Sequence, residues 1–119
     1  HVNNARYFSY MEVARVWYYR SVLDWRGDAR SFATILARAE CDFRQPLVLG
    51  DTAQVYMRTA RIGTKSYDFE YAITRDSDGM IAAVGRTVQV MFDYQRNQSI
   101  PVPAAWREAL AAYERAPIV

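Results

Sequence analysis

The chain opens with a long, uninterrupted helical pattern. Residues 4–23 contain no Gly or Pro, and apolar side chains recur there every three or four positions. Asn3 or Asn4 can cap such a helix, and Gly27 with Asp28 supplies its end. Further apolar residues fall on the other helical faces. This predicts a central helix that is enclosed by other structure.

Four later segments alternate apolar and polar residues, which is the pattern of half-buried strands. They cover residues 37–44, 51–62, 66–74 and 80–94. The alternation in the second segment slips near Thr59 and Ala60, which predicts a β-bulge. Turn residues separate the segments. The last three are expected to form an antiparallel meander.

A closing helix is predicted after Pro103, because Trp106, Leu110 and Tyr113 share one helical face. Helix, four antiparallel strands and helix make an α+β architecture. Twenty helical residues and nine or ten strand residues each span about 30 Å, so helix and sheet match in length. A long helix wrapped by such a sheet is typical of the hot-dog fold, which has one more strand before the helix. We expect that first strand to be missing from this chain.

Composition narrows the function classes. A chain of 119 residues with 51% hydrophobic residues predicts a single domain over residues 1–119. Its 15 basic and 13 acidic residues are interspersed, which argues against a nucleic-acid partner, and no apolar run is long enough for a membrane span. Cys41 is the only cysteine and His1 the only histidine. No disulfide, metal site or Ser-His-Asp triad is therefore expected, and the location is expected to be reducing and cytoplasmic.

Two motifs carry a family resemblance. The opening HVNNARY, continued by YMEVAR, resembles the G-H-V-N-N-x-x-Y-x-x-Y-x-E-x-A-R segment of hot-dog acyl-CoA thioesterases in the 4-hydroxybenzoyl-CoA thioesterase-like superfamily. The stretch DFRQPL at 42–47 and the Lys65–Ser66 pair support the match along the rest of the chain. The resemblance implies hydrolysis of an acyl-CoA to free acid and coenzyme A, with no cofactor apart from the coenzyme A of the substrate.

The resemblance also assigns catalytic roles. The family's attacking carboxylate is an aspartate immediately before the position of His1, so we expect the principal carboxylate upstream of this chain. The backbone amides of Asn3 and Asn4 are the expected oxyanion donors, because a helix N-terminus offers free N–H groups and a positive dipole. Both asparagines could instead only cap the helix. His1 is either an acid–base partner or an ordinary loop residue.

Glu12 is a second candidate carboxylate, because another type of hot-dog thioesterase uses a helix glutamate. The preferred interpretation is a buried structural pair between Glu12 and Arg15, three residues apart on the helix. Cys41 lies on an apolar strand face and is expected to be a packing residue rather than a nucleophile.

Substrate binding is inferred in the same way. The family binds the phosphates of coenzyme A near the strand that opens with Lys65 and Ser66, and Arg61 and Arg86 are candidate substitutes for two arginines that some relatives carry there. A solvated turn lysine is the alternative for Lys65. The acyl chain is expected between helix and sheet, beside residues that are mostly core: Phe8, Met11, Trp17, Tyr67 and Phe69.

A homodimer paired through residues 34–43 is expected from the resemblance, and a tetramer is left open. The leading function is acyl-CoA thioesterase. The alternatives are a non-catalytic hot-dog protein that binds acyl-CoA or assists assembly, and a hot-dog dehydratase, which needs a histidine paired with a carboxylate. The sequence leaves open the length of the acyl chain and the choice between coenzyme A and acyl carrier protein.

Overall fold

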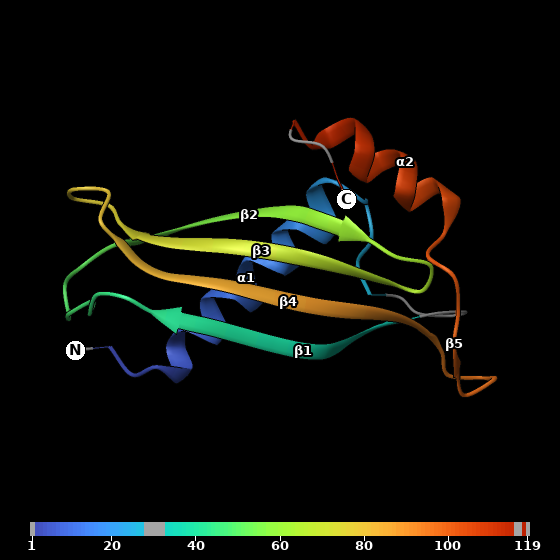
Figure 1. The fold of residues 1–119 in the computed structure, drawn as a ribbon, viewed down its shortest axis with the longest axis horizontal. Helices are drawn as coiled ribbons and strands as arrows, with labels where there is room; N and C mark the ends of the chain where they lie inside the picture. The colour runs from blue at the N-terminus through green and yellow to red at the C-terminus, as the bar shows by residue number, and fades with distance from the viewer. Residues whose placement is uncertain (1, 28–32, 116–117, 119) are drawn as a thin grey trace.

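The computed structural model describes residues 2–27, 33–115 and 118. In chain order its elements are α1 (Ala5–Ser21), β1 (Ala33–Phe43), β2 (Ala53–Ile62), β3 (Ser66–Arg75), β4 (Ile81–Asp93), β5 (Gln98–Ser99) and α2 (Ala104–Tyr113). The long strands form one antiparallel sheet in the order β1-β4-β3-β2, and the short β5 pairs with β4. The helix α1 crosses one face of the sheet, and α2 lies near the end of β2 (Figure 1). This is the predicted α+β hot-dog arrangement.

The predicted meander is confirmed, because β2 pairs with β3 and β3 with β4. The predicted bulge in β2 is confirmed as well, since the register with β3 shifts between Thr59 and Arg61. A second bulge between Leu36 and Arg38 of β1 was not predicted. It reverses the alternation of apolar and polar residues, which explains why β1 begins at Ala33 although the regular pattern begins only at residue 37.

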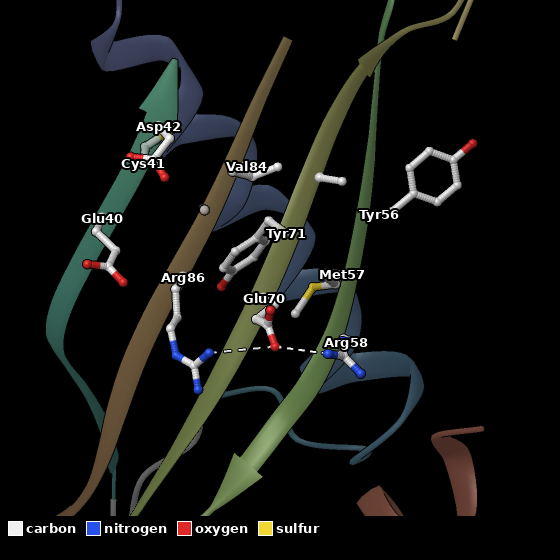
Figure 2. Close-up of a pocket in the computed structure, with 12 residues that line it drawn as sticks. Glu40, Cys41, Asp42, Tyr56, Met57, Arg58, Glu70, Tyr71, Val84 and Arg86 are labelled. Carbon is white, nitrogen blue, oxygen red and sulfur yellow. Dashed lines mark hydrogen bonds and ion pairs between the residues drawn. The ribbon is translucent and has the colours of Figure 1, made fainter. Parts of the chain in front are cut away.

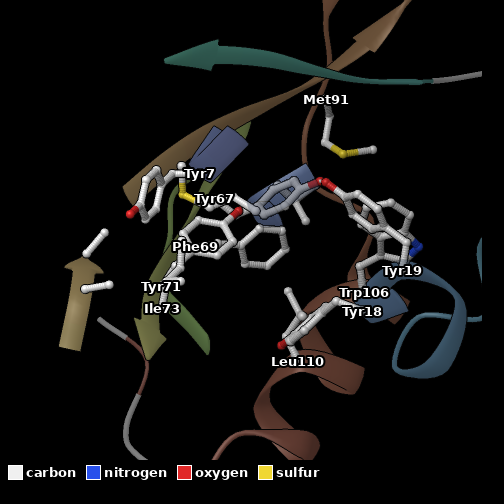
Figure 3. Close-up of a cluster of buried hydrophobic side chains, with 14 of the residues drawn as sticks. Tyr7, Tyr18, Tyr19, Tyr67, Phe69, Tyr71, Ile73, Met91, Trp106 and Leu110 are labelled. Carbon is white, nitrogen blue, oxygen red and sulfur yellow. The ribbon is translucent and has the colours of Figure 1, made fainter. Parts of the chain in front are cut away.

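The core fills the space between α1 and the sheet and is closed by α2. Figure 3 shows it as a cluster of mostly aromatic side chains. Tyr18 of α1 packs on Phe69 of β3 with ring centroids 4.9 Å apart, and Trp106 and Leu110 of α2 are buried beside them. Each such side chain contributes about 1.5–3 kcal/mol through burial. Met11, Tyr67 and Phe69 are fully buried, as expected of core residues.

Close approach of α1 to the sheet depends on Gly85 of β4. A Cβ atom at this position would lie 2.5 Å from Sδ of Met11 and 3.2 Å from the backbone oxygen of Glu40. Met11 itself is fully buried. The missing side chain at Gly85 therefore makes room for Met11, and it identifies the face of β4 that is turned toward α1.

The prediction that α1 is enclosed on all sides was wrong for this chain. Only the stripe facing the sheet is buried, whereas Val13 is 69% exposed and Trp17 55% exposed. Phe8 also lies at the surface rather than between helix and sheet. The reason is that α1 packs against one face of one sheet, so within the described residues Val13 and Trp17 only line an open hollow beside Val55 and Met57 of β2.

No helix within the described residues is long and apolar enough to cross a membrane.

Candidate functional site

The N-terminus of α1 is fixed to the loop that follows β1. The Val2 N–H donates to the carbonyl of Leu47 at 2.7 Å, and the Leu47 N–H donates to the Tyr7 hydroxyl at 3.3 Å. Leu47 is almost fully buried. These contacts hold the start of the helix over one end of the sheet, and they give the DFRQPL segment a role in placing the opening motif.

Asn3 and Asn4 occupy different places at this helix start. The Asn3 side chain caps α1, because its Oδ1 accepts the Ala5 N–H at 2.9 Å. Asn4 makes no capping bond through its side chain. Within the described part of the chain, the backbone amides of Asn3 and Asn4 donate to no other residue, and both residues are exposed. Two amides and the positive end of the helix dipole are thus open to an oxyanion. The His1 prediction lies outside the described residues.

Aromatic surface adjoins these amides. Phe43, the last residue of β1, packs edge-on against Tyr7 and Phe8, with ring centroids 5.2 and 6.5 Å apart. Phe8 and Phe43 nevertheless remain 37% and 43% exposed. An apolar group that reaches the start of α1 would therefore cover exposed aromatic surface there.

The predicted buried pair of Glu12 and Arg15 was wrong. Glu12 is exposed on α1, while the half-buried Arg15 Nη1 donates to the Tyr71 hydroxyl at 3.2 Å. The Tyr71 hydroxyl is also 2.6 Å from Thr87 Oγ1. Arg15 lies on the sheet-facing stripe of α1, where it meets the Tyr71 hydroxyl of the sheet, and Glu12 remains exposed beside that stripe.

The structure brings Arg61, Ser66 and Arg86 together around Asp68. One carboxylate oxygen of Asp68 accepts a hydrogen bond from Arg61 Nη1 at 3.2 Å. The other accepts hydrogen bonds from Arg86 Nε and Nη2 at 3.1 and 2.9 Å. Arg61 Nη1 also donates to Ser66 Oγ at 3.4 Å. Lys65 is exposed in the preceding turn. Sequence reasoning missed Asp68, because a carboxylate at a polar strand position looks solvent-exposed until the bulge and the strand register place it between two arginines.

A row of alternating charges crosses the sheet face turned away from α1. Arg58, Glu70, Arg86 and Glu40 stand on adjacent strands in register. Glu70 Oε1 lies 3.0 Å from Arg58 and 3.6 Å from Arg86, as the dashed lines in Figure 2 show. These residues line a groove of about 630 Å³. Arg86 thus has carboxylates on two sides, whereas the Arg61 side chain is 44% exposed.

The turn between β2 and β3 is braced by α2. Arg107 Nη2 donates to the carbonyl oxygens of Gly63 and Thr64, the latter at 3.1 Å. Lys65 follows directly in the chain. Arg107 therefore holds the backbone that presents Lys65. No local pattern signals this contact, because it joins residues more than 40 positions apart.

Cys41 is half-buried against the core, and burial followed by the neighbouring Asp42 charge raises its thiol pKa. A raised pKa disfavours the nucleophilic thiolate, in agreement with the predicted packing role. Within the described residues, His, Cys, Asp and Glu side chains form no group of three that could hold a metal ion.

The chain is similar to known thioesterases over nearly its whole length. Residues 1–110 match the thioesterase-like superfamily. The long-chain acyl-CoA thioesterase FadM of Escherichia coli K12 is 27% identical over 113 residues, or 92% of this chain and 84% of FadM. A thioesterase of Thermus thermophilus, solved in complex with coenzyme A and Zn, is 36% identical with a TM-score of 0.85, covering 99% of this chain and 84% of that one.

The fold extends to more distant proteins. The 1,4-dihydroxy-2-naphthoyl-CoA thioesterase of Synechocystis is 19% identical with a TM-score of 0.80, and the match covers 97% of this chain and 86% of that one. At this identity the likeness shows a shared fold alone. The match over residues 1–110 decides the family: the chain belongs to the thioesterase-like superfamily and is a thioester hydrolase.

Proposed function

We propose that the protein hydrolyses an acyl-CoA to a free acid and coenzyme A. The observation that carries this proposal is the start of α1, where the Asn3 and Asn4 amides are open and the exposed ring of Phe8, packed on Phe43, follows one helical turn later. Hydrogen-bond donors for a thioester oxygen and apolar surface for an acyl group thus lie together. The acyl-CoA substrate of FadM and the coenzyme A bound to the Thermus thioesterase support the same substrate class.

The chemistry follows from these groups. A carboxylate, placed by the family pattern immediately before His1, either attacks the thioester carbonyl or removes a proton from the attacking water. The carbonyl oxygen gains negative charge, and the amides of Asn3 and Asn4 stabilise it. One such donor lowers the barrier by about 3 kcal/mol. The C–S bond then breaks, and the thiolate of coenzyme A leaves and is protonated, with His1 as the candidate acid–base partner. Where water attacks, the free acid forms in this step; where the carboxylate attacks, a second water hydrolyses the resulting anhydride to the free acid and restores the carboxylate.

Coenzyme A binds through its phosphates at the turn before β3 in this proposal. Lys65, Ser66 and Arg61 supply cationic and hydroxyl donors, which are the groups that bind phosphate. Arg86 is bound by Asp68 and Glu70, so its part is to set the local charge more than to donate a free N–H.

A homodimer completes the proposed site. In the described part of the chain β1 pairs only with β4, and Leu36 and Phe43 of β1 remain exposed on the side of α1. Pairing of two β1 strands would remove one free edge from each copy, the β1 edge, and cover this apolar surface beside the helix start. A tetramer stays open. Light scattering on a Leu36→Glu variant tests the pairing: a shift toward monomer supports it, and an unchanged mass contradicts it.

The mechanism is tested by thiol release from a series of acyl-CoAs with the natural full-length protein. Replacing the carboxylate expected before His1 with Ala should abolish turnover, whereas Glu12→Gln should retain it, because Glu12 is exposed. Loss of turnover only in Glu12→Gln would move the catalytic carboxylate to α1. Binding of acyl-CoA without hydrolysis of any member would instead favour the non-catalytic binding protein.

A further inference from the structure

Asp68 is an ionisable side chain that the proposed chemistry does not use, yet it is only 6% exposed. Gly85 faces α1, so its neighbour Arg86 faces the other side of the sheet, where it covers Asp68. Arg61 covers Asp68 from β2. A carboxylate so far removed from water is stable only with charged hydrogen-bond partners, and Asp68 has two.

The hydrogen bonds leave one arginine with free donors. Arg86 uses Nε and Nη2 on Asp68, and its Nη1 lies 3.6 Å from Glu70. Arg61 uses only Nη1, which serves both Asp68 and Ser66. Its Nε and Nη2 donate to no other described residue, and the side chain is 44% exposed. Asp68 therefore orients a partly free guanidinium next to Ser66 and the Lys65 turn.

We infer that Asp68 is a positioning residue for the phosphates of coenzyme A: it fixes Arg61 beside Lys65 and Ser66, so that the three groups meet an anionic nucleotide together. This inference rests on the proposed function. Asp68 does not touch the ligand. Its contribution is the orientation of a long side chain that would otherwise lose rotamer freedom on binding.

Charge and geometry predict opposite results for removal of the Asp68 charge. The local cations Arg61, Lys65 and Arg86 face a polyanion, so loss of one negative charge should by itself strengthen phosphate binding. Loss of the Asp68 carboxylate as a hydrogen-bond acceptor should weaken phosphate binding, because a neutral amide cannot hold both arginines as the carboxylate does. The sign of the change in affinity therefore separates a positioning role from a simple charge effect.

The experiment compares the natural protein with Asp68→Asn by calorimetric binding of coenzyme A and by steady-state hydrolysis. Two substrates with the same acyl group are used, acyl-CoA and acyl-pantetheine, which lacks the nucleotide phosphates. We expect Kd for coenzyme A and KM for acyl-CoA to rise about fivefold to tenfold. KM for acyl-pantetheine and both kcat values should stay within about twofold. Asp42→Asn, an exposed carboxylate on the same sheet face, is the matched charge control.

Three outcomes would overturn the inference: unchanged or tighter binding of coenzyme A in Asp68→Asn, equal KM increases for both substrates, or a loss of the same size in Asp42→Asn. If Asp68→Asn does not fold, Arg61→Met must give the same loss confined to acyl-CoA, or the inference fails. A different result would refute the proposed function while leaving the role of Asp68 intact. A natural protein that hydrolyses no acyl-CoA, yet binds coenzyme A more tightly than Asp68→Asn does, would refute the thioesterase proposal and support the positioning role.

Discussion

The Tyr18 hydroxyl donates a 2.5 Å hydrogen bond to Glu114, and this contact joins α1 to the residue that follows α2. The same oxygen of Glu114 accepts the backbone N–H of Thr59 at 2.9 Å. Thr59 Oγ1 lies 2.8 Å from the Tyr18 hydroxyl. One carboxylate therefore satisfies a fully buried phenol and a backbone donor on the outer strand β2, at the bulge.

Removal of this carboxylate should destabilise the fold. Glu114→Ala leaves the Thr59 N–H and the Tyr18 hydroxyl with fewer partners in a buried place, which costs about 1–3 kcal/mol. Urea unfolding measures the change. Glu108→Ala, at an exposed position of α2, is the matched control and should be within about 0.5 kcal/mol of the natural protein. Equal effects of the two substitutions would contradict a structural role for the Glu114 contact.

Alkaline pH should destabilise the protein through its buried tyrosines. Burial, followed by the hydrogen bond to Glu114, raises the pKa of Tyr18 far above its ordinary value of 10.0. Burial also raises the pKa of Tyr67. Above pH 10 the unfolded chain releases these protons while the folded chain keeps them, so the free energy of unfolding falls by about 1.4 kcal/mol per pH unit for each fully perturbed phenol.

Urea titrations between pH 8 and about pH 11.5 test this dependence. Stability should be level up to about pH 9 and then decline, with a shallower decline in Tyr18→Phe than in the natural protein. The exposed Tyr94→Phe serves as the control. Identical slopes for Tyr18→Phe and Tyr94→Phe would refute the assignment to Tyr18.

Gly85→Ala should cost about 1–3 kcal/mol, because the new methyl group would overlap the buried Met11 side chain. Shortening Met11 in the same chain should relieve the overlap. The double variant Met11→Ala with Gly85→Ala is therefore expected to be more stable than the sum of the two single effects. Strict additivity in chemical unfolding would show that Gly85 is not needed for the approach of α1.

Cys41 should react slowly with thiol reagents in the folded protein, because burial raises its pKa. An Ellman titration of native and urea-unfolded protein compares the rates directly, with slow modification before unfolding and fast modification after it. The Cys41→Ala variant should hydrolyse acyl-CoA at a rate within about twofold of the natural protein. Loss of activity in this variant, with folding intact, would contradict the packing role.

Local patterns predicted most of the backbone. Alternation over residues 66–74 identified β3, and the phase slip at Thr59 located the bulge in β2. The two-residue β5 was missed, because such a segment is too short to show alternation. The opening motif placed Asn3 and Asn4 at the start of α1, where the structure has them.

Contacts between distant segments could not be read from local patterns. The helical pattern of α1 does not distinguish Val13 and Trp17 at the surface from residues in the core, because both faces are apolar. The Glu12–Arg15 prediction failed for a related reason: a three-residue spacing permits an ion pair but does not reveal that Arg15 meets Tyr71 instead. Asp68 gains its partners only through strand register and a bulge.

Hydrolysis of an acyl-CoA is tested by simultaneous detection of free thiol and free acid from a chain-length and aromatic series of acyl-CoAs. A thioesterase should give equal amounts of both products from at least one member, at a rate proportional to the concentration of the full-length protein. If no member of the series releases thiol while acyl-CoA still binds, the protein is not an acyl-CoA thioesterase.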